Sequence, residues 1–408
     1  MKAFLILEDG TVFEGTHIGA DKEVISEIVF NTSMAGYLEV LTDPSYAGQA
    51  VCMTYPLIGN YGICRDDMES LKAWPDGFIV RELSRIPSNF RNDCSIQQFL
   101  EENDIPGIAG IDTRALVKIL REKGTMNGMI TTDADYRFDE IQPRLRAYTT
   151  GRVVEKVSCR EKYTLRAVTE LSQNGPLSGM ARFDREAYER GEREPRPALV
   201  KELNGAGLKV ALMDFGAKRN IARSLASRGC EVTVYPALTS AEEIIAAKPD
   251  GIMLSNGPGD PKECTSIIEE LKKLYRTEIP IFAICLGHQL MALASGADTY
   301  KMKYGHRGGN HPVKDLETGR VYISSQNHGY VVDTDRLDPE VAVPAFINVN
   351  DGTNEGLTYT GKDIFTVQFH PEACCGPQDS GYLFDRFIEL MKKRKPEIEL
   401  EKGENCNA

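Results

Sequence analysis

Apolar and polar positions in the second half of the chain follow two alternating periods. Short apolar segments alternate with longer segments of helical spacing, in the order 210–215, 219–228, 231–235, 241–248, 251–254 and 265–275. Strands that alternate with helices form a parallel sheet covered on both faces, and ligands bind outside the carboxyl ends of its strands. The pattern therefore predicts a doubly wound, mainly parallel α/β domain over residues 208–395, with a final helix at 382–393.

The first half of the chain has a different pattern. Its strongest hairpin signal is Asp9-Gly10, between strand-like residues 4–8 and 11–14. The other expected elements are strands at 24–32, 50–55, 78–83 and 126–131 and helices at 34–41, 95–102 and 114–123. Because strands and helices do not alternate strictly, residues 1–132 are predicted to form a separate α+β domain.

The region between them, residues 133–207, has weak periodicity and a charged run at 182–196. We interpret it as a solvated, charged connector with helical patches, and an interaction arm is the alternative. One strand is expected within it, at residues 153–158. Residues 396–408 are interpreted as a polar tail.

The composition is that of a globular protein of two to three domains, with 408 residues, 41% hydrophobic and 26% charged. A formal net charge of −12 argues against a general nucleic-acid or anionic-membrane surface. No apolar run has the length of a signal peptide or of the ~18 residues that span a membrane, so a cytoplasmic location is expected. The ten cysteines have no paired spacing, and neither a disulfide framework nor a metal site is expected.

The candidate nucleophile is Cys285. It follows an apolar segment, with a tight turn expected at Gly287 and a helical pattern from Gln289. A strand that ends at a cysteine and continues as a helix is a nucleophile elbow. The unpaired N–H groups of the helix N-terminus favour thiolate over thiol. We therefore expect the chemistry of this chain at Cys285.

A second loop, Gly257-Pro258-Gly259, follows the preceding strand and is expected at the same edge of the sheet. It lacks the Lys-Ser/Thr of a P-loop and the third glycine of a dinucleotide fingerprint, which argues against nucleotide binding. Glycine lets the backbone point an N–H at a ligand, so this loop could form an oxyanion hole with a second donor from Leu286. A simple type II turn is the alternative.

The expected base is His370, at the end of a predicted strand. Pro371 stiffens the chain, and Glu372 falls on the same side of an extended segment, where its carboxylate can orient the imidazole. His288 is the competing base, but its side chain is expected to point away from Cys285, so we interpret it as structural. The other histidines are interpreted as loop or core hydrogen-bonding residues: His17, His306, His311 and His328.

These segments resemble the class I, triad-type glutamine amidotransferases. The matching stretches are Pro-x-Phe-Ala-Ile-Cys285-Leu-Gly-His-Gln289, Ser-Asn-Gly257-Pro-Gly259-Asp-Pro and Gln-Phe-His370-Pro-Glu372. Further stretches, among them Leu-Thr-Asp-Pro-Ser45-Tyr-Ala-Gly-Gln and Ser-Gln-Asn327-His-Gly329-Tyr330, resemble the small, glutaminase subunits of carbamoyl-phosphate synthetases. The N-terminal domain is the discriminating feature, since other class I amidotransferases lack it.

The resemblance implies that Cys285 attacks the side-chain amide of glutamine, forms a thioester and releases ammonia. His370 would be the base and then the acid, oriented by Glu372. The residues implied to bind L-glutamine are Ser45, Gly257, Gly259, Leu286, Gln289, Asn327, Gly329 and Tyr330. The family usually has Phe in place of Tyr330, and a backbone contact there would survive the change. Ser45 belongs to the N-terminal domain, so glutamine would be held across the domain interface.

The resemblance also implies a partner. In this family a large synthetase subunit receives ammonia through a tunnel and uses ATP, Mg and bicarbonate to make carbamoyl phosphate for arginine and pyrimidine synthesis. No cofactor is expected in the present chain, and a substantial partner interface is expected through the N-terminal domain. The alternatives are an amidotransferase that serves another synthetase, a hydrolase of another γ-glutamyl bond, and a non-catalytic scaffold subunit.

Overall fold

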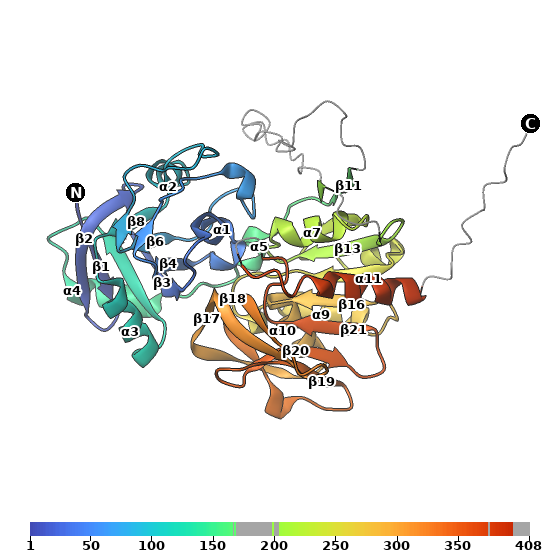
Figure 1. Cartoon of the computed structure of the whole chain (residues 1–408). Helices are drawn as coiled ribbons and strands as arrows, with labels where there is room; N and C mark the ends of the chain where they lie inside the picture. Colours follow the sequence, from blue (N-terminus) through green and yellow to red (C-terminus); the bar gives the residue numbers. More distant parts are fainter. Residues whose placement is uncertain (166, 169–197, 200–203, 374–375, 395–408) are drawn as a thin grey trace, which may run out of the picture.

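The computed structural model describes residues 1–165, 167–168, 198–199, 204–373 and 376–394, which form two domains beside one another (Figure 1). The expected polar tail and the charged run of the connector lie outside the described residues. Among the helices within these ranges, none is long and apolar enough to cross a membrane.

The N-terminal domain is built on a closed barrel, which the sequence pattern did not predict. Its strands follow one another in the order β1-β2-β8-β6-β4-β3-β9. They are β1 (Lys2–Leu7), β2 (Val12–Gly19), β3 (Val24–Asn31), β4 (Gln49–Met53), β6 (Gly77–Val80), β8 (Pro106–Ala109) and β9 (Met126–Thr131). The hairpin expected at Asp9-Gly10 joins β1 to β2, with Ile6 opposite Val12. Strand β8, which closes the barrel between β2 and β6, was missed because only four residues mark it.

Successive residues of the barrel strands point to two different apolar clusters. Val29 and Val51 pack with α1 (Tyr37–Thr42) and α2 (Ile96–Glu102), whereas their neighbours Ile28 and Ala50 pack with α3 (Thr113–Lys123). The smaller elements are η1 (Pro44–Tyr46), β5 (Leu57–Ile58), η2 (Arg65–Asp67) and β7 (Glu82–Leu83). Helices therefore cover both sets of strand side chains.

The first part of the predicted connector is ordered. Helix α4 (Phe138–Ala147) packs Ile141 and Leu145 into an apolar cluster with barrel residues. The bounds of this helix were not predicted, because Pro143 lies inside it. The connector was expected to contain helical patches, and this one packs against the barrel instead of being solvated on all sides.

The strand expected at residues 153–158 is also wrong. That stretch forms one helical turn, α5 (Val154–Val157), with both valines buried. The next element, β10 (Tyr163–Leu165), adds an antiparallel edge strand to the large sheet by pairing with β14. Two short strands, β11 (Ala167–Val168) and β12 (Ala198–Leu199), pair with each other.

The C-terminal domain contains a ten-stranded sheet in the order β10-β14-β13-β15-β16-β21-β20-β19-β17-β18. Its parallel core is formed by β13 (Lys209–Asp214), β14 (Glu231–Pro236), β15 (Gly251–Leu254), β16 (Ile281–Ile284) and β21 (Ile364–Val367). The antiparallel extension consists of β17 (Asp298–Asp315), β18 (Val321–Asp333), β19 (Ala342–Asn348) and β20 (Asn354–Tyr359). The doubly wound α/β core is as predicted, while the β-rich end extends the same sheet.

Helices cover both faces of the parallel core (Figure 1). One apolar cluster holds α7 (Arg219–Ala226) and α11 (Tyr382–Arg394) against the sheet. The opposite cluster holds α8 (Ala241–Ala246), α9 (Thr265–Tyr275) and α10 (Leu286–Ala294). The single-turn elements η3 (Pro261–Glu263) and η4 (Thr334–Arg336) lie in connections. Because the core strands are parallel, the loops after β13, β15, β16 and β21 share one edge of the sheet.

Candidate active site

The chain turns sharply at Cys285, between β16 and α10. Cys285 has φ 54° and ψ −106°, a strained conformation for a residue with a side chain. The tight turn was expected at Gly287. Glycine is required there by lack of space instead, because a Cβ would lie 2.6 Å from the carbonyl oxygen of Leu254. Helix α10 therefore packs directly on β15, and the cysteine itself adopts the elbow conformation, with only 2% of its surface exposed.

His370 and Glu372 follow β21, the strand beside β16. Nδ1 of His370 lies 2.7 Å from Oε1 of Glu372, and both side chains are buried. We assign a proton to Nδ1, because an N–H there donates to the carboxylate. Nε2 has no nitrogen or oxygen partner among the described residues, which leaves it available to Cys285.

The charges around His370 favour its protonated form. Burial and the ammonium of Lys218 would lower the pKa of His370, but Glu372 and Cys285 outweigh them and raise this pKa to about 9. Burial would raise the pKa of Glu372, but His370 and Lys218 lower it to about 2. In neutral solution the imidazole therefore holds a second proton beside Cys285, which it can donate to a leaving group.

Lys218 is a residue of this site that the sequence analysis missed. Its buried Nζ lies 3.4 Å from Oδ2 of Asp43 and 3.5 Å from Oε1 of Glu372. Burial would lower the pKa of Lys218, but these carboxylates raise it, so the ammonium is charged. Its Nζ also lies 3.2 Å from Nδ1 of His370, which we interpret as close approach because both nitrogens are donors here.

A positional signal could have identified Lys218. It lies between β13 and α7, and β13 pairs in parallel with β15. The loop after β13 therefore reaches the same edge of the sheet as Cys285. The strand and the helix were predicted, but the charged residue between them was not.

The loop after β15 approaches the elbow closely. A Cβ at Gly257 would lie 2.2 Å from the carbonyl oxygen of Phe215, and Gly259 has φ of 90°. Glycine is therefore required at the first position by lack of space and at the second by the left-handed backbone. Leu286 begins α10, so its N–H has no acceptor within the helix. Both features are compatible with N–H donors beside Cys285.

Strand β18 brings Asn327, Gly329 and Tyr330 to the same region. Sγ of Cys285 lies 3.7 Å from the carbonyl oxygen of Asn327. Nε2 of Gln289, on α10, donates to the carbonyl oxygen of Tyr330 at 2.8 Å. This contact uses the backbone of Tyr330, so it does not depend on whether the side chain is Tyr or Phe.

The barrel contributes Ser45 and Asp43, from η1 and the residue before it. Nδ2 of Asn256 donates to Oγ of Ser45 at 2.9 Å, and Nδ2 of Asn327 donates to Oδ2 of Asp43 at 3.0 Å. The N–H of Ser45 donates to the other carboxylate oxygen of Asp43 at 2.9 Å. All of these side chains are buried, so the site is formed by both domains.

A cavity of about 320 Å³ lies beside Cys285 at this interface. Seven of the eight residues expected to bind glutamine line it, namely Ser45, Gly257, Gly259, Gln289, Asn327, Gly329 and Tyr330. Leu286, His370 and Glu372 are buried but do not line it. Its volume suits a small-molecule ligand.

His288 does not take the role of base. It is fully buried, and its Nδ1 lies 2.7 Å from the hydroxyl oxygen of Thr366 on β21. Burial lowers the pKa of His288 to about 3, so the imidazole is neutral. These contacts support the interpretation of His288 as a structural residue.

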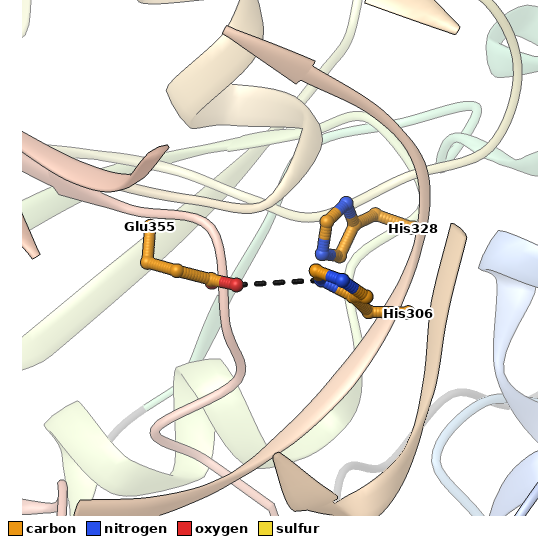
Figure 2. Close-up of side chains that lie close together, drawn as sticks. All are labelled: His306, His328 and Glu355. Atoms are coloured by element: carbon orange, nitrogen blue, oxygen red, sulfur yellow. Dashed lines mark ion pairs between the residues drawn. The ribbon is translucent and has the colours of Figure 1, made fainter. Parts of the chain in front are cut away.

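Three buried residues could in principle hold a metal ion. His306, His328 and Glu355 place ligand atoms within 4.8 Å of one another, and Figure 2 shows the carboxylate directed at the His306 ring with His328 beside it. In the structure described here, each ring nitrogen already has a polar neighbour. Nε2 of His306 lies 2.8 Å from Asp351, and the two nitrogens of His328 lie 2.8 Å from the Tyr330 carbonyl and 2.7 Å from Gln326.

The cluster therefore forms part of a hydrogen-bonded network that includes His328 on β18. Burial would lower the pKa of His306, but Asp351 and Glu355 outweigh it and raise the pKa to about 9. A charged His306 then has a carboxylate beside each ring nitrogen, as a buried charge requires. Through His328 the network reaches the backbone of Tyr330, which also receives the hydrogen bond from Gln289.

Comparisons with known proteins agree with this two-domain site. Residues 5–130 match the family model "Carbamoyl-phosphate synthase small chain, CPSase domain", and residues 211–390 match "Glutamine amidotransferase class-I". The first match covers the barrel, and the second covers the parallel sheet with Cys285 and His370.

Relatives match over nearly their full length. A carbamoyl phosphate synthase small chain of Clostridium perfringens is 48% identical over 389 residues, which are 95% of this chain and 99% of the relative. The small chain of Oceanobacillus iheyensis is 47% identical, with 97% of each chain covered. That of Fusobacterium nucleatum is 47% identical over 94% of this chain and 97% of its own. The chain therefore belongs to the carbamoyl phosphate synthase small chain family and carries a class I glutamine amidotransferase domain.

Proposed function

We propose that this chain is the glutaminase subunit of a carbamoyl phosphate synthase and hydrolyses L-glutamine to glutamate and ammonia. The observation that carries the proposal is the convergence of Cys285, His370 and Glu372 at adjacent strand ends beside a cavity that both domains line. The family supports the same reading, because its amidotransferase domain is joined to the barrel in one chain.

The first half of the reaction forms a thioester. The thiolate of Cys285 attacks the γ-carbonyl carbon of glutamine, and the carbonyl electrons move to its oxygen. The N–H of Leu286 and those of the Gly257 loop are the donors proposed to hold this oxyanion. His370 then donates its Nε2 proton to the amide nitrogen, the C–N bond breaks, ammonia leaves and the C–S bond remains.

The second half consumes water. His370 accepts a proton from a water molecule whose oxygen attacks the thioester carbon, the C–S bond breaks and glutamate is released. Glu372 holds the imidazole through Nδ1 in both halves, and Lys218 limits how far negative charge accumulates around it. Glutamine would be held by the residues around the cavity, including Ser45 from the barrel.

We further propose that the ammonia passes to a separate large subunit. That subunit would bind ATP and Mg and make carbamoyl phosphate from bicarbonate, for arginine and pyrimidine synthesis in the cytoplasm. The relatives are named small chains, which supports a larger partner, and this sequence has neither a P-loop pattern nor a dinucleotide fingerprint. Enclosed transfer has a physical reason, because free ammonia in neutral water is mostly protonated and no longer a nucleophile.

The decisive experiment replaces Cys285 by serine in the chain assembled with its large subunit. Glutamine-dependent carbamoyl phosphate synthesis should be abolished, while synthesis from added ammonium salts should persist, because only ammonia production is lost. The matched control is Cys64→Ser in the barrel, which should leave both activities unchanged. Equal loss of both activities would contradict the proposed division between subunits, and cleavage of a γ-glutamyl peptide with glutamine untouched would favour the hydrolase alternative.

A further inference from the structure

One ion pair joins the two domains at the wall of the cavity. Nζ of Lys301, on β17, lies 2.6 Å from Oε1 of Glu27, on barrel strand β3. Both residues line the cavity that contains Cys285. Neither was singled out by the sequence, and neither is needed for the chemistry proposed above.

The carboxylate of Glu27 is held firmly by the barrel. Its Oε2 accepts from Nε2 of Gln49 at 2.7 Å, and its Oε1 accepts from the hydroxyl of Thr125 at 3.0 Å. Burial would raise the pKa of Glu27, but Lys301 and Arg307 outweigh it and lower the pKa, so the group is charged. Three protein donors hold its two oxygens in place, so Glu27 can anchor Lys301.

Lys301 lies where the pairing of β17 with β18 changes register. It pairs directly with Tyr330 across β17 and β18, and the ladder between these strands then shifts register before His306. The N-terminal domain also holds this irregular segment and the residue that follows His306. The N–H of Thr125 donates to the carbonyl oxygen of Lys303 at 2.9 Å, and the N–H of Thr32 donates to that of Arg307 at 3.2 Å.

We propose that Glu27 and Lys301 are positioning residues for glutamine, which set the β18 segment Asn327–Tyr330 against Ser45 of the barrel. The pair acts through strand β17, because Lys301 is bound to the barrel on one side and paired with Tyr330 on the other. The inference rests on the proposed glutaminase function and assigns the barrel a second contribution to that site.

The expected effect is on substrate binding more than on stability. The side chain of Lys301 is 51% exposed, so the ion pair by itself stabilises the fold little. Loss of the link should loosen contacts that the bound substrate and the transition state share, and such a loss raises KM with little change in kcat. For Lys301→Met, which keeps the apolar stem, we expect KM for glutamine to rise about five- to tenfold and kcat to change less than about twofold.

The test measures steady-state glutamine hydrolysis by the chain assembled with its large subunit. Lys301→Met, Glu27→Gln and the double variant form a cycle, in which the double variant should be little worse than either single variant. Lys301→Arg should restore most of the affinity, because it restores the charge to Glu27. The matched control is Lys272→Met, which removes a 2.6 Å pair to Glu269 from a comparably exposed lysine on α9. Its KM should equal that of the unmodified chain.

Several outcomes would overturn the proposal. The proposal is wrong if Lys301→Met leaves KM unchanged, if the two single effects add in full, or if Lys301→Arg does not restore KM. Thermal unfolding of each variant separates a local effect from lost folding, and Glu27→Asp gives a second, milder variant whose KM should also rise. If the unmodified chain does not hydrolyse glutamine, the proposed function is wrong. If it does, and the variants have the same KM as the unmodified chain, only this inference is wrong.

Discussion

The barrel and the α/β domain contribute to one cavity by different structural means. In the α/β domain the groups follow strand ends, with Cys285 after β16, His370 after β21 and Gly257 after β15. In the N-terminal domain, Asp43 directly precedes the 3-10 helix η1, and Glu27 lies on strand β3. The sheet places reacting atoms through its backbone, while the barrel acts through side chains that cross the domain interface.

The two domains therefore differ in role: the α/β domain carries out the proposed chemistry, and the barrel helps to place the substrate. The residues proposed to form and break bonds all belong to the α/β domain. The barrel supplies Ser45 and three buried carboxylates, Asp43, Glu27 and Glu69, that contact or face groups of the other domain. Variants in the α/β domain should therefore affect turnover most strongly, and variants in the barrel should affect glutamine affinity or stability.

The largest expected effect tests the chemical half of this comparison. His370→Asn should lower kcat for glutamine hydrolysis on the order of 1,000-fold, because the proton donor and acceptor is lost. Glu372→Gln should cost roughly 10- to 100-fold less than His370→Asn, because the base remains and only its orientation and charge balance change. Both rates are measured with glutamine, and synthesis from ammonium salts is the control. A Glu372→Gln variant that is slower than His370→Asn would refute these role assignments.

The groups of the α/β domain could be predicted because strand-end positions leave a sequence signal. Cys285 and His370 were found from short apolar runs that end at reactive residues, and the glycines of the Gly257 loop were found in the same way. The tight turn was expected at Gly287, whereas the structure has the positive φ at Cys285. Periodicity locates a turn but does not say which residue adopts the unusual φ.

The second prediction tests the barrel half. Asp43→Asn keeps the shape of the side chain but removes the charge that faces Lys218 and the acceptor for Nδ2 of Asn327. A hydrogen bond to a charged group contributes about 1.5–3 kcal/mol, so KM for glutamine should rise about tenfold or more. The control is Asp67→Asn, which removes a half-exposed pair with Arg91 and should not change KM. A fall in kcat with KM unaltered would place Asp43 in the chemistry instead.

The barrel contributions could not be predicted from pattern. Ser45 was reached only through family resemblance, since from its own neighbours it reads as a turn residue. Asp43 and Glu27 were missed, because a side chain that bonds across a domain interface has no periodic partner in its own segment. Barrel closure was missed for a related reason, since the pairing of β8 with β2 and β6 joins segments far apart in the chain. Local rules do not encode such pairings.

The smallest expected effect concerns Glu69, which the barrel buries against the first turn of α7. Nδ2 of Asn220 donates to its Oε1 at 2.7 Å, and burial is the main cause that raises the pKa of Glu69 to about 7. A carboxyl group whose folded pKa lies above its usual 4.5 stabilises the fold at low pH, and that contribution is lost as pH rises through about 7.

Between pH 6 and pH 8 the unmodified chain should therefore lose about 1 kcal/mol of unfolding free energy through this one group. Glu69→Gln should remove that loss, so the difference in stability between variant and unmodified chain should move in favour of the variant as pH rises. Thermal unfolding across this range measures it, with Glu122→Gln on the exposed face of α3 as the control. If the difference stays constant with pH, Glu69 does not titrate between pH 6 and pH 8, and burial does not raise its pKa to about 7.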